Sequence, residues 1–417
     1  MVILNTNFQI NTMKKILTIL LTFSGLAITA QNNFLFPDSS NQVLMNTKGG
    51  VASSSIPQKF MNKFLFPGYI DENLKDAASN KMKGNNYFGG AFVGNINVLS
   101  SKKREDSKKQ KITGFGFGTN IEANLKFPKD LFDLTFYGNK PYADETLNLN
   151  NTNFNSLAYS YLEFSLGQSV VNNDIQSSVW ADLGLLVGHS YTDISFKQAS
   201  LFTEENGDYL ELNLSESSIS LSDTISTSLA QGFGAKIDFF YSRQTPNSKL
   251  LIAAENIGGI FWQNTSSANL DTTLNFEGIE IGNIFQLADS VWSEVGTIDS
   301  LLSTTKKDAF KTIPINFSAY FRKDLSLIYF DVLARYRLFA NYIPYLRAGL
   351  NFNLRNIKPG ITTSYGGYST FNFGINTDVD VFNTLKIQVG TNNILGSILP
   401  NSTSALDVYL GLRLKFN

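Results

Sequence analysis

Apolar and polar positions alternate along much of this chain, most clearly at its end. From Leu406 to Phe416 the apolar side chains are separated by single polar, small or amphipathic residues such as Asp407, Tyr409 and Lys415. Successive side chains of a strand point to opposite faces, so this pattern predicts a strand with one apolar and one polar face. About ten residues is also the length that a tilted strand needs to cross a bilayer.

The alternation recurs upstream, for example over 115–127, where Phe115, Phe117 and Ile121 alternate with polar residues such as Asn120 and Glu122. A soluble sandwich alternates in the same way, so strand length decides between the two architectures. Soluble strands average about five or six residues, whereas these stretches run to about ten to thirteen, in the range of transmembrane strands. We therefore expect an all-β fold, a transmembrane antiparallel β-barrel of about fourteen strands with a partly helical plug or lid insertion.

The predicted strands cover 86–98, 112–127, 155–167, 177–191, 208–222, 227–243, 248–262, 270–282, 312–323, 325–338, 342–354, 368–381, 384–394 and 405–416. A barrel of this size encloses a lumen too wide for its own wall side chains to fill, so a plug is needed or the lumen conducts water. The barrel with its insertion is expected to span 86–417.

Two stretches outside these strands could fill or gate the lumen. Residues 31–85 are predicted to form an N-terminal periplasmic or plug segment. Apolar residues at three-to-four spacing predict a partly helical insertion over 284–310, which is either a surface loop or a plug that moves with ligand. Counting predicted strands back from a periplasmic C-terminus puts this insertion on the periplasmic side.

The first 30 residues have the features of a secretory signal peptide. Lys14 and Lys15 precede an apolar run that ends in Thr29 and Ala30, and Met13 is the more natural start. Secretion and membrane strands together predict the outer membrane of a Gram-negative bacterium. With no cysteine, the chain can be neither a lipoprotein nor a disulfide-stapled domain.

Composition and charge exclude several classes of function. Charged residues are 17% of the chain and the net charge is −1, which excludes a strongly basic nucleic-acid-binding surface. The single histidine, His189, lacks the partners of a catalytic triad or a histidine-rich metal site. We therefore expect no enzyme activity, no catalytic residue, no cofactor and no metal site. The pairs Glu204–Glu205 and Asp378/Asp380 are interpreted as a loop and a lumen lining.

The lumen face is where function is expected, because the charged residues of the alternating strands project inward if the apolar set faces lipid. Both signs occur, which predicts ion pairs across neighbouring strands and little ion selectivity. The candidate lumen-lining residues are Glu122, Lys236, Asp238, Asp331, Arg335, Arg337, Arg347, Asp378, Asp380 and Arg413.

Four stretches carry a resemblance to a known group of proteins. They are 86–90 (NYFGG), 154–167, the motif ENIGGIFW over 255–262 followed by 276–278, and GTNNI over 390–394. The mature chain resembles an uncharacterised family of Bacteroidota outer-membrane barrels. That family is distantly similar to FadL-type transporters of hydrophobic compounds and to barrels associated with type IX secretion.

The stretch 257–262 breaks strict alternation and contains two glycines, which predicts a wall bulge formed by Gly258, Gly259, Phe261 and Trp262. Such a bulge is either structural or, as the FadL resemblance implies, a lateral exit for an apolar ligand.

Two functions remain open from the sequence. The first is a FadL-like channel for an apolar small molecule. The alternative is a non-transporting scaffold or docking barrel in an envelope or secretion complex. The expected partners are outer-membrane lipid and lipopolysaccharide, whose phosphates the basic run 102–111 could bind, together with an apolar ligand or an envelope protein.

Overall fold

A computed structural model describes residues 41–66, 68–103, 108–222, 230–277, 305–382 and 384–416. Within these residues the chain forms a closed antiparallel barrel of fourteen strands, because seventeen strands share one sheet and three of them (β4, β7 and β10) lie outside the ring. The predicted barrel and its strand number are confirmed.

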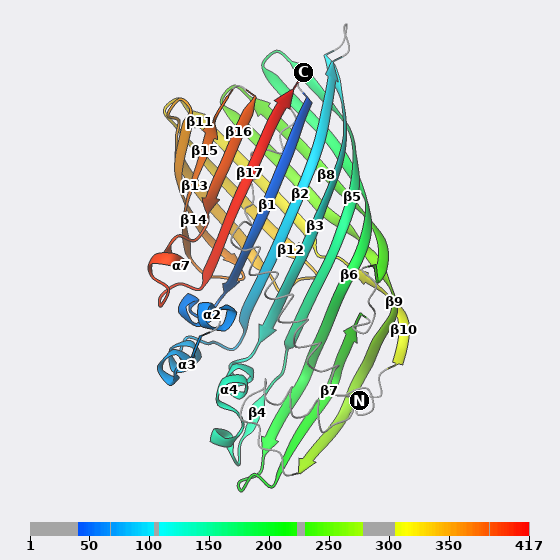
Figure 1. Ribbon diagram of the computed structural model, residues 1–417, viewed down its shortest axis with the longest axis vertical. Coiled ribbons are helices and arrows are strands. Elements are labelled where there is room, and N and C mark those ends of the chain that lie inside the picture. The colour runs from blue at the N-terminus through cyan, green and yellow to red at the C-terminus, as the bar shows by residue number, and fades with distance from the viewer. Residues whose placement is uncertain are drawn as a thin grey trace.

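The strands of the ring follow one another in chain order (Figure 1). They are β1 (Asn41–Ser53), β2 (Asn86–Lys103), β3 (Lys109–Phe127), β5 (Thr152–Asn172), β6 (Ile175–Thr203), β8 (Gly232–Thr245), β9 (Ser248–Glu277), β11 (Ile315–Leu325), β12 (Ile328–Leu338), β13 (Ile343–Phe352), β14 (Ile357–Gly367), β15 (Asn372–Asp380), β16 (Leu385–Thr391) and β17 (Ala405–Phe416).

β1 closes the barrel, since Thr47 is paired with Leu410 of β17 on one side and with Gly94 of β2 on the other. The prediction that the barrel begins at residue 86 is therefore wrong. The alternation of β1 is weak, because Thr47 and two adjacent glycines, Gly49 and Gly50, interrupt its apolar positions.

Three other strand predictions need correction. β14 was missed, because Pro359 and Gly360 resemble a turn although both residues pair with β15. The predicted strand 208–222 corresponds to β7 (Tyr209–Leu221), which lies outside the ring. The predicted strand 270–282 begins as the continuation of β9, whose described part ends at Glu277.

The two ends of the barrel differ in their connections. At the end where β1 begins and β17 finishes, here called the terminal end, short turns such as 173–174, 246–247 and 326–327 join the strands. At the opposite end, here called the helix end, most connections are longer. They contain α2 (Gln58–Leu65), α3 (Glu72–Ser79), α4 (Lys129–Tyr137), the 3-10 helix η2 (Lys140–Tyr142) and α7 (Leu395–Ile398), as Figure 1 shows.

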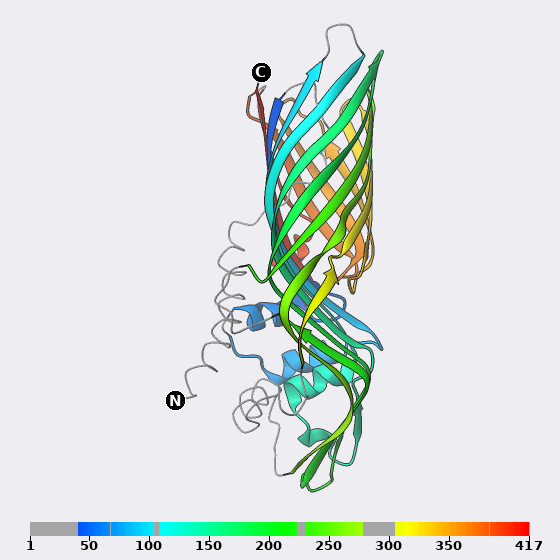
Figure 2. The same cartoon turned by 90° about the vertical axis from the view of Figure 1, so that its right-hand side faces the viewer.

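Beyond the helix end, β6 and β9 continue into an extension (Figure 2). There they pair with β7, while β4 (Thr146–Asn148) joins β6 and β10 (Thr305–Thr312) joins β9. An apolar cluster from β4, β6, β7, β9 and α4 forms its core, with Leu201 and Leu210 among its buried members. A second cluster joins α2, α3 and α4, with Phe60, Ala78 and Phe132 at its centre. α2 and α3 are thus at the helix end, within the segment predicted as a periplasmic or plug segment.

Most of the predicted insertion 284–310 lies outside the described residues. Its flanks, Glu277 and Thr305, belong to the extension and so lie at the opposite end from Phe416. The strand count that put the insertion on the C-terminal side is wrong because the missed strand β14 shifts the parity by one.

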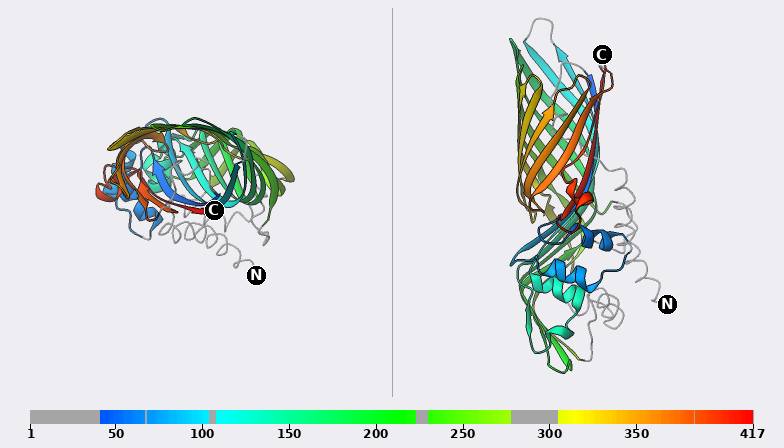
Figure 3. Two further views of the ribbon diagram at one scale, coloured as in Figure 1. Left: turned by 90° about the horizontal axis from the view of Figure 1, so that it is seen from above. Right: turned by 90° about the vertical axis from the view of Figure 1, so that its left-hand side faces the viewer.

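The barrel is apolar outside and polar inside. Outward side chains such as Phe117, Leu185 and Phe233 are between 49% and 62% exposed, whereas the inward Glu122, Asp331 and Arg347 are at most 4% exposed. Seen from above, the strands form a flattened ring (Figure 3). Among the described residues, no helix is long and apolar enough to span a membrane.

Candidate functional site

The lumen contains a cavity of about 360 Å³. Toward the helix end it reaches Ala52, Tyr368 and Asn393, and toward the terminal end it reaches Phe240 and Arg347. Six of the ten predicted lumen residues line this cavity, namely Glu122, Lys236, Asp238, Arg335, Arg337 and Arg347.

Basic groups gather on one sector of the cavity wall, formed by β12 and β13. Arg337 crosses the lumen to pair with Glu122 of β3, and it also donates to Asn316 at 2.8 Å and to the Tyr368 hydroxyl at 3.2 Å. Arg335 lines the same cavity, and no ion pair within the described residues involves it. Arg337 therefore has a carboxylate partner across the lumen, whereas Arg335 has a hydrogen bond with Tyr342 and no carboxylate partner among the described residues.

Acidic groups gather on the sector formed by β5, β6, β8 and β9. Glu163, Asp182 and Asp238 are all buried and each places a carboxylate oxygen within 4.8 Å of the others. The Lys236 ammonium lies 3.0 Å from Glu163 and 2.5 Å from Asp238, and it sits over the ring of Tyr161. The cavity is thus lined by opposite charges on two different sectors.

Toward the terminal end, buried side chains fill the lumen. Arg347 pairs with Asp331, which also accepts a hydrogen bond from Asn351 at 2.9 Å. Tyr320 and Tyr329 are each 1% exposed. We call Tyr320, Tyr329, Asp331 and Arg347 the tyrosine–arginine layer. Its side chains are buried in the lumen on the terminal side of the cavity.

The remaining predicted lumen residues lie toward the terminal end. Asp378 accepts hydrogen bonds from Gln388 at 2.7 Å and Tyr329 at 3.3 Å. Asp380 pairs with Lys358 and Lys386, and Arg413 donates to Gln42 at 2.9 Å. The carboxylates Asp378 and Asp380 therefore have structural partners.

The wall irregularity predicted at Gly258 and Gly259 lies instead at Asn256. Ile237 is paired with Ile257 but Phe239 with Ala254, so β9 has an extra residue there, and Asn256 has a positive φ of 64°. The Asn256 amide donates to Asp238 at 2.5 Å. The two glycines are regularly paired, and they allow close approach of Ala235 and Phe310.

The bulge reverses which residues of β9 face inward. Beyond it, Trp262 is fully buried while Phe261 is 47% exposed on the outer face. Trp262 packs on Tyr191 with ring centroids 4.8 Å apart, in a cluster with Ile260 and Ile313. The inner face of the predicted exit is therefore packed with apolar side chains.

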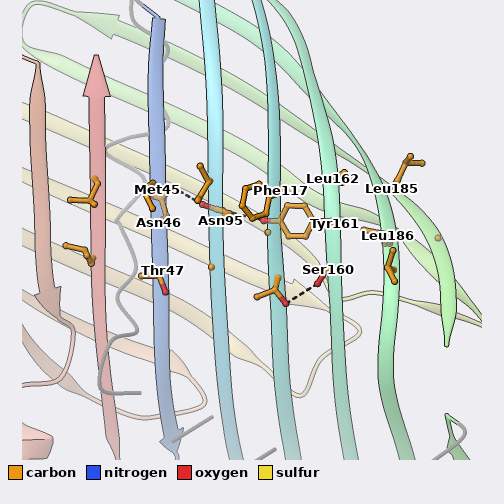
Figure 4. Close-up of a pocket in the computed structure, with 18 of the residues that line it drawn as sticks. Met45, Asn46, Thr47, Asn95, Phe117, Ser160, Tyr161, Leu162, Leu185 and Leu186 are labelled. Atoms are coloured by element: carbon orange, nitrogen blue, oxygen red, sulfur yellow. Dashed lines mark hydrogen bonds between the residues drawn. The ribbon is translucent and has the colours of Figure 1, made fainter. Parts of the chain in front are cut away.

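An apolar concavity of about 770 Å³ lies on the outer wall (Figure 4). Its floor is a row of small residues in register across four strands, Thr47, Gly94, Thr119 and Ser160. Its rim is formed by outward residues that include Met45, Phe117, Leu162 and Leu185. The paired strands separate this concavity from the lumen.

His189 occupies a bulge of β6, since Ala158 is paired with Ser190 but Tyr159 with Gly188. Its Nε2 lies 2.8 Å from the Ser160 hydroxyl. The histidine thus marks the region where β6 leaves the barrel for the extension.

Sequence reasoning missed two features of the lumen. Asp182 was overlooked, although its place between the outward Val179, Ala181 and Leu183 already put it on the inner face. The buried Tyr320 and Tyr329 were not assigned to either face of their strands. Because a phenol ring is both apolar and polar, alternation alone does not assign it to either face.

No curated protein sequence matches the chain. Similar solved structures include the toluene transporter TbuX of Ralstonia pickettii, with 9% identity, a TM-score of 0.41, and 91% of this chain and 90% of that chain covered. They also include the toluene transporter TodX of Pseudomonas putida, with 10% identity, a TM-score of 0.41, and coverage of 94% and 93%.

The translocator domain of the autotransporter NalP from Neisseria meningitidis is more distant, with 6% identity, a TM-score of 0.32, and coverage of 91% and 90%. A family profile matches residues 22–388, which is most of the sequence. The chain belongs to the family of unknown function DUF5723.

Proposed function

We propose that this protein is an outer-membrane β-barrel that admits a small polar solute to its lumen and passes it across the membrane. The single observation that carries the proposal is the charged cavity inside a barrel with an apolar exterior. An apolar outer belt around a polar interior is the arrangement expected of a barrel whose outer solvent is lipid.

The connections support an orientation. Outer-membrane barrels have short periplasmic turns and longer extracellular loops. The terminal end, with its short turns, would then face the periplasm and the helix end would face outward. In this orientation the lysine-rich hairpin that pairs Lys102 with Lys111 faces the periplasm, away from lipopolysaccharide.

The cavity lining indicates the class of solute. Desolvating Arg335 beside an apolar molecule would leave its charge without a carboxylate, whereas a polar solute can satisfy it. A FadL-like channel for an apolar molecule has less support, because the apolar concavity lies on the outer wall. Lipid chains are the expected occupant of that concavity.

Transport requires the tyrosine–arginine layer to move. We expect Tyr320→Ala, which truncates a ring that is 1% exposed, to increase solute flux through the barrel. The matched control is Tyr365→Ala, which truncates an outward ring that is 60% exposed. Liposome swelling with purified protein and small sugars or amino acids measures the flux.

An increase for Tyr320→Ala but not for Tyr365→Ala supports a gated lumen. Equal, background-level swelling for wild type and both variants, with correct folding shown by heat-modifiable migration, would contradict the transport proposal.

The extension supports a second candidate, a scaffold in an envelope complex. It adds β4, β7 and β10 and three packed helices beyond the helix end, a surface that passage through the lumen does not require. Extraction from native membrane in mild detergent followed by mass spectrometry separates the two functions. A stoichiometric protein partner with no small molecule favours the scaffold, and a bound polar solute favours transport.

A further inference from the structure

Strand pairing brings together three carboxylates on the inner wall. Ser165, Asp182 and Asp238 lie directly opposite one another on β5, β6 and β8. In the neighbouring row, Glu163 and Lys236 flank Gly184 in the same way. A Cβ at Gly184 would lie 2.7 Å from the Lys236 side chain, so the glycine lets the lysine cross β6 and reach Glu163.

The charges of this cluster do not balance. Asp182 and Asp238 are directly opposed like charges, an arrangement that destabilises a sheet unless a cation lies between them. Lys236 contacts Glu163 and Asp238. Three carboxylates and one ammonium leave two negative charges, which one divalent cation would neutralise.

Asp182 supplies an independent observation that points to a ligand. The side chain is 7% exposed, and its Oδ1 atom has no hydrogen-bond partner among the described residues. One carboxylate oxygen of Asp182 lies within 4.8 Å of one oxygen each of Glu163 and Asp238. A buried carboxylate oxygen without a partner is costly, so such groups usually coordinate a metal or pair with a charge.

We propose that Glu163, Asp182 and Asp238 form a binding site for a hard divalent cation, with Ca²⁺ as the preferred ion. Ca²⁺ binds oxygen ligands at about 2.3–2.6 Å, so ligands on opposite sides of the ion lie about 5 Å apart. The spacing of the three carboxylates falls within that span. All three residues also line the lumen cavity, which gives water access to complete the coordination shell.

Ion binding would also affect the wall bulge at Asn256, because the backbone amide of Asn256 donates a hydrogen bond to the ligand Asp238. It is independent of the proposed transport, since a scaffold barrel could hold the same ion. Measurements of metal binding are therefore sufficient to test the site.

Terbium luminescence tests the proposal on the full-length protein in detergent. Tb³⁺ replaces Ca²⁺ at oxygen sites and emits when a nearby tryptophan is excited. Trp180 is the next inward residue to Asp182 on β6 and stacks on Phe240 with centroids 4.8 Å apart. We expect sensitised emission that saturates with Tb³⁺ and is reversed by Ca²⁺.

The variant Asp182→Asn removes one ligand charge, and we expect it to weaken Tb³⁺ binding by about tenfold or more. It should still fold, because it removes one of two opposed carboxylates. The matched control is Asp378→Asn, which changes a lumen carboxylate whose two oxygens already have partners, and its affinity should equal that of wild type. Lys236→Met should strengthen binding by removing the competing ammonium.

The proposal is overturned if folded wild-type protein shows no sensitised emission, if Ca²⁺ does not displace Tb³⁺, or if Asp182→Asn binds as tightly as wild type. Equal losses in Asp182→Asn and Asp378→Asn would show nonspecific binding to lumen carboxylates and would also overturn it.

Discussion

The barrel and the extension share two strands but bury opposite kinds of side chain. In the barrel part of β9, Ile252 and Phe261 are 48% and 47% exposed on the outer face. In the extension part, Leu270 is buried in an apolar core and Thr272 is exposed. β6 changes in the same way, from the exposed Leu185 to the buried Leu201.

Some strands bury polar side chains along one part and apolar side chains along another. This change is expected where the surroundings of the strand change. The extension is built like a water-soluble domain, with an apolar core and polar surface, whereas the barrel is built for an apolar exterior solvent. The reversal coincides with irregular backbone, at His189 of β6 and at Asn256 and Asn264 of β9, both asparagines having positive φ. If the barrel spans the outer membrane as proposed, the membrane boundary crosses the molecule near these residues.

The largest expected difference in stability between the barrel and the extension concerns their ion pairs. Asp331→Asn in the barrel leaves the Arg347 guanidinium buried without its carboxylate, which costs about 3–5 kcal/mol. Glu216→Gln in the extension breaks the exposed pair with Lys197 and should cost about 1 kcal/mol or less. Urea unfolding in lipid vesicles measures both values. Equal costs would remove the distinction between the two regions.

The second expected difference in stability concerns the apolar core of the extension. Leu210→Ala creates a cavity in the extension core, and such truncations cost about 2–5 kcal/mol. Because the barrel does not depend on this core, amide hydrogen exchange should accelerate in β7 and stay unchanged in β12 to β17. Uniform acceleration across the barrel would show that the two regions unfold as one unit.

Charges introduced at exposed positions of the two regions should give the third contrast. Ile252→Lys places an ammonium against lipid, at a cost of about 2–4 kcal/mol near the bilayer midplane. Thr272→Lys, on the same strand in the extension, places it in water and should change stability by about 0.5 kcal/mol or less. Comparable effects in vesicles would place both positions in the same solvent.

Alternation predicted twelve of the ring strands because most outward positions of each strand are apolar. It failed where that face contains Thr47 and glycines, as in β1, or Pro359, as in β14. It divided β9 in two, because a polar stretch beginning at Gln263 separates the barrel part from the extension part.

The inward direction of Glu122 and Arg337 could be predicted, but their pairing across the lumen could not. They lie on β3 and β12, which are not neighbours in the ring, so their contact depends on barrel closure and tilt. Lys236 similarly reaches past β6 to Glu163. Local sequence pattern assigns a face to a residue but does not identify its partner on a distant strand.

The measurement that tests the account most directly is spin-label accessibility at two positions of β9. The chain has no cysteine, so Ile252→Cys and Thr272→Cys can each be labelled uniquely after reconstitution into lipid vesicles. We predict that the label at 252 collides mainly with oxygen, which concentrates in lipid, and that the label at 272 collides mainly with a water-soluble nickel complex. Preferential collision with the nickel complex at both positions would contradict a membrane-embedded barrel.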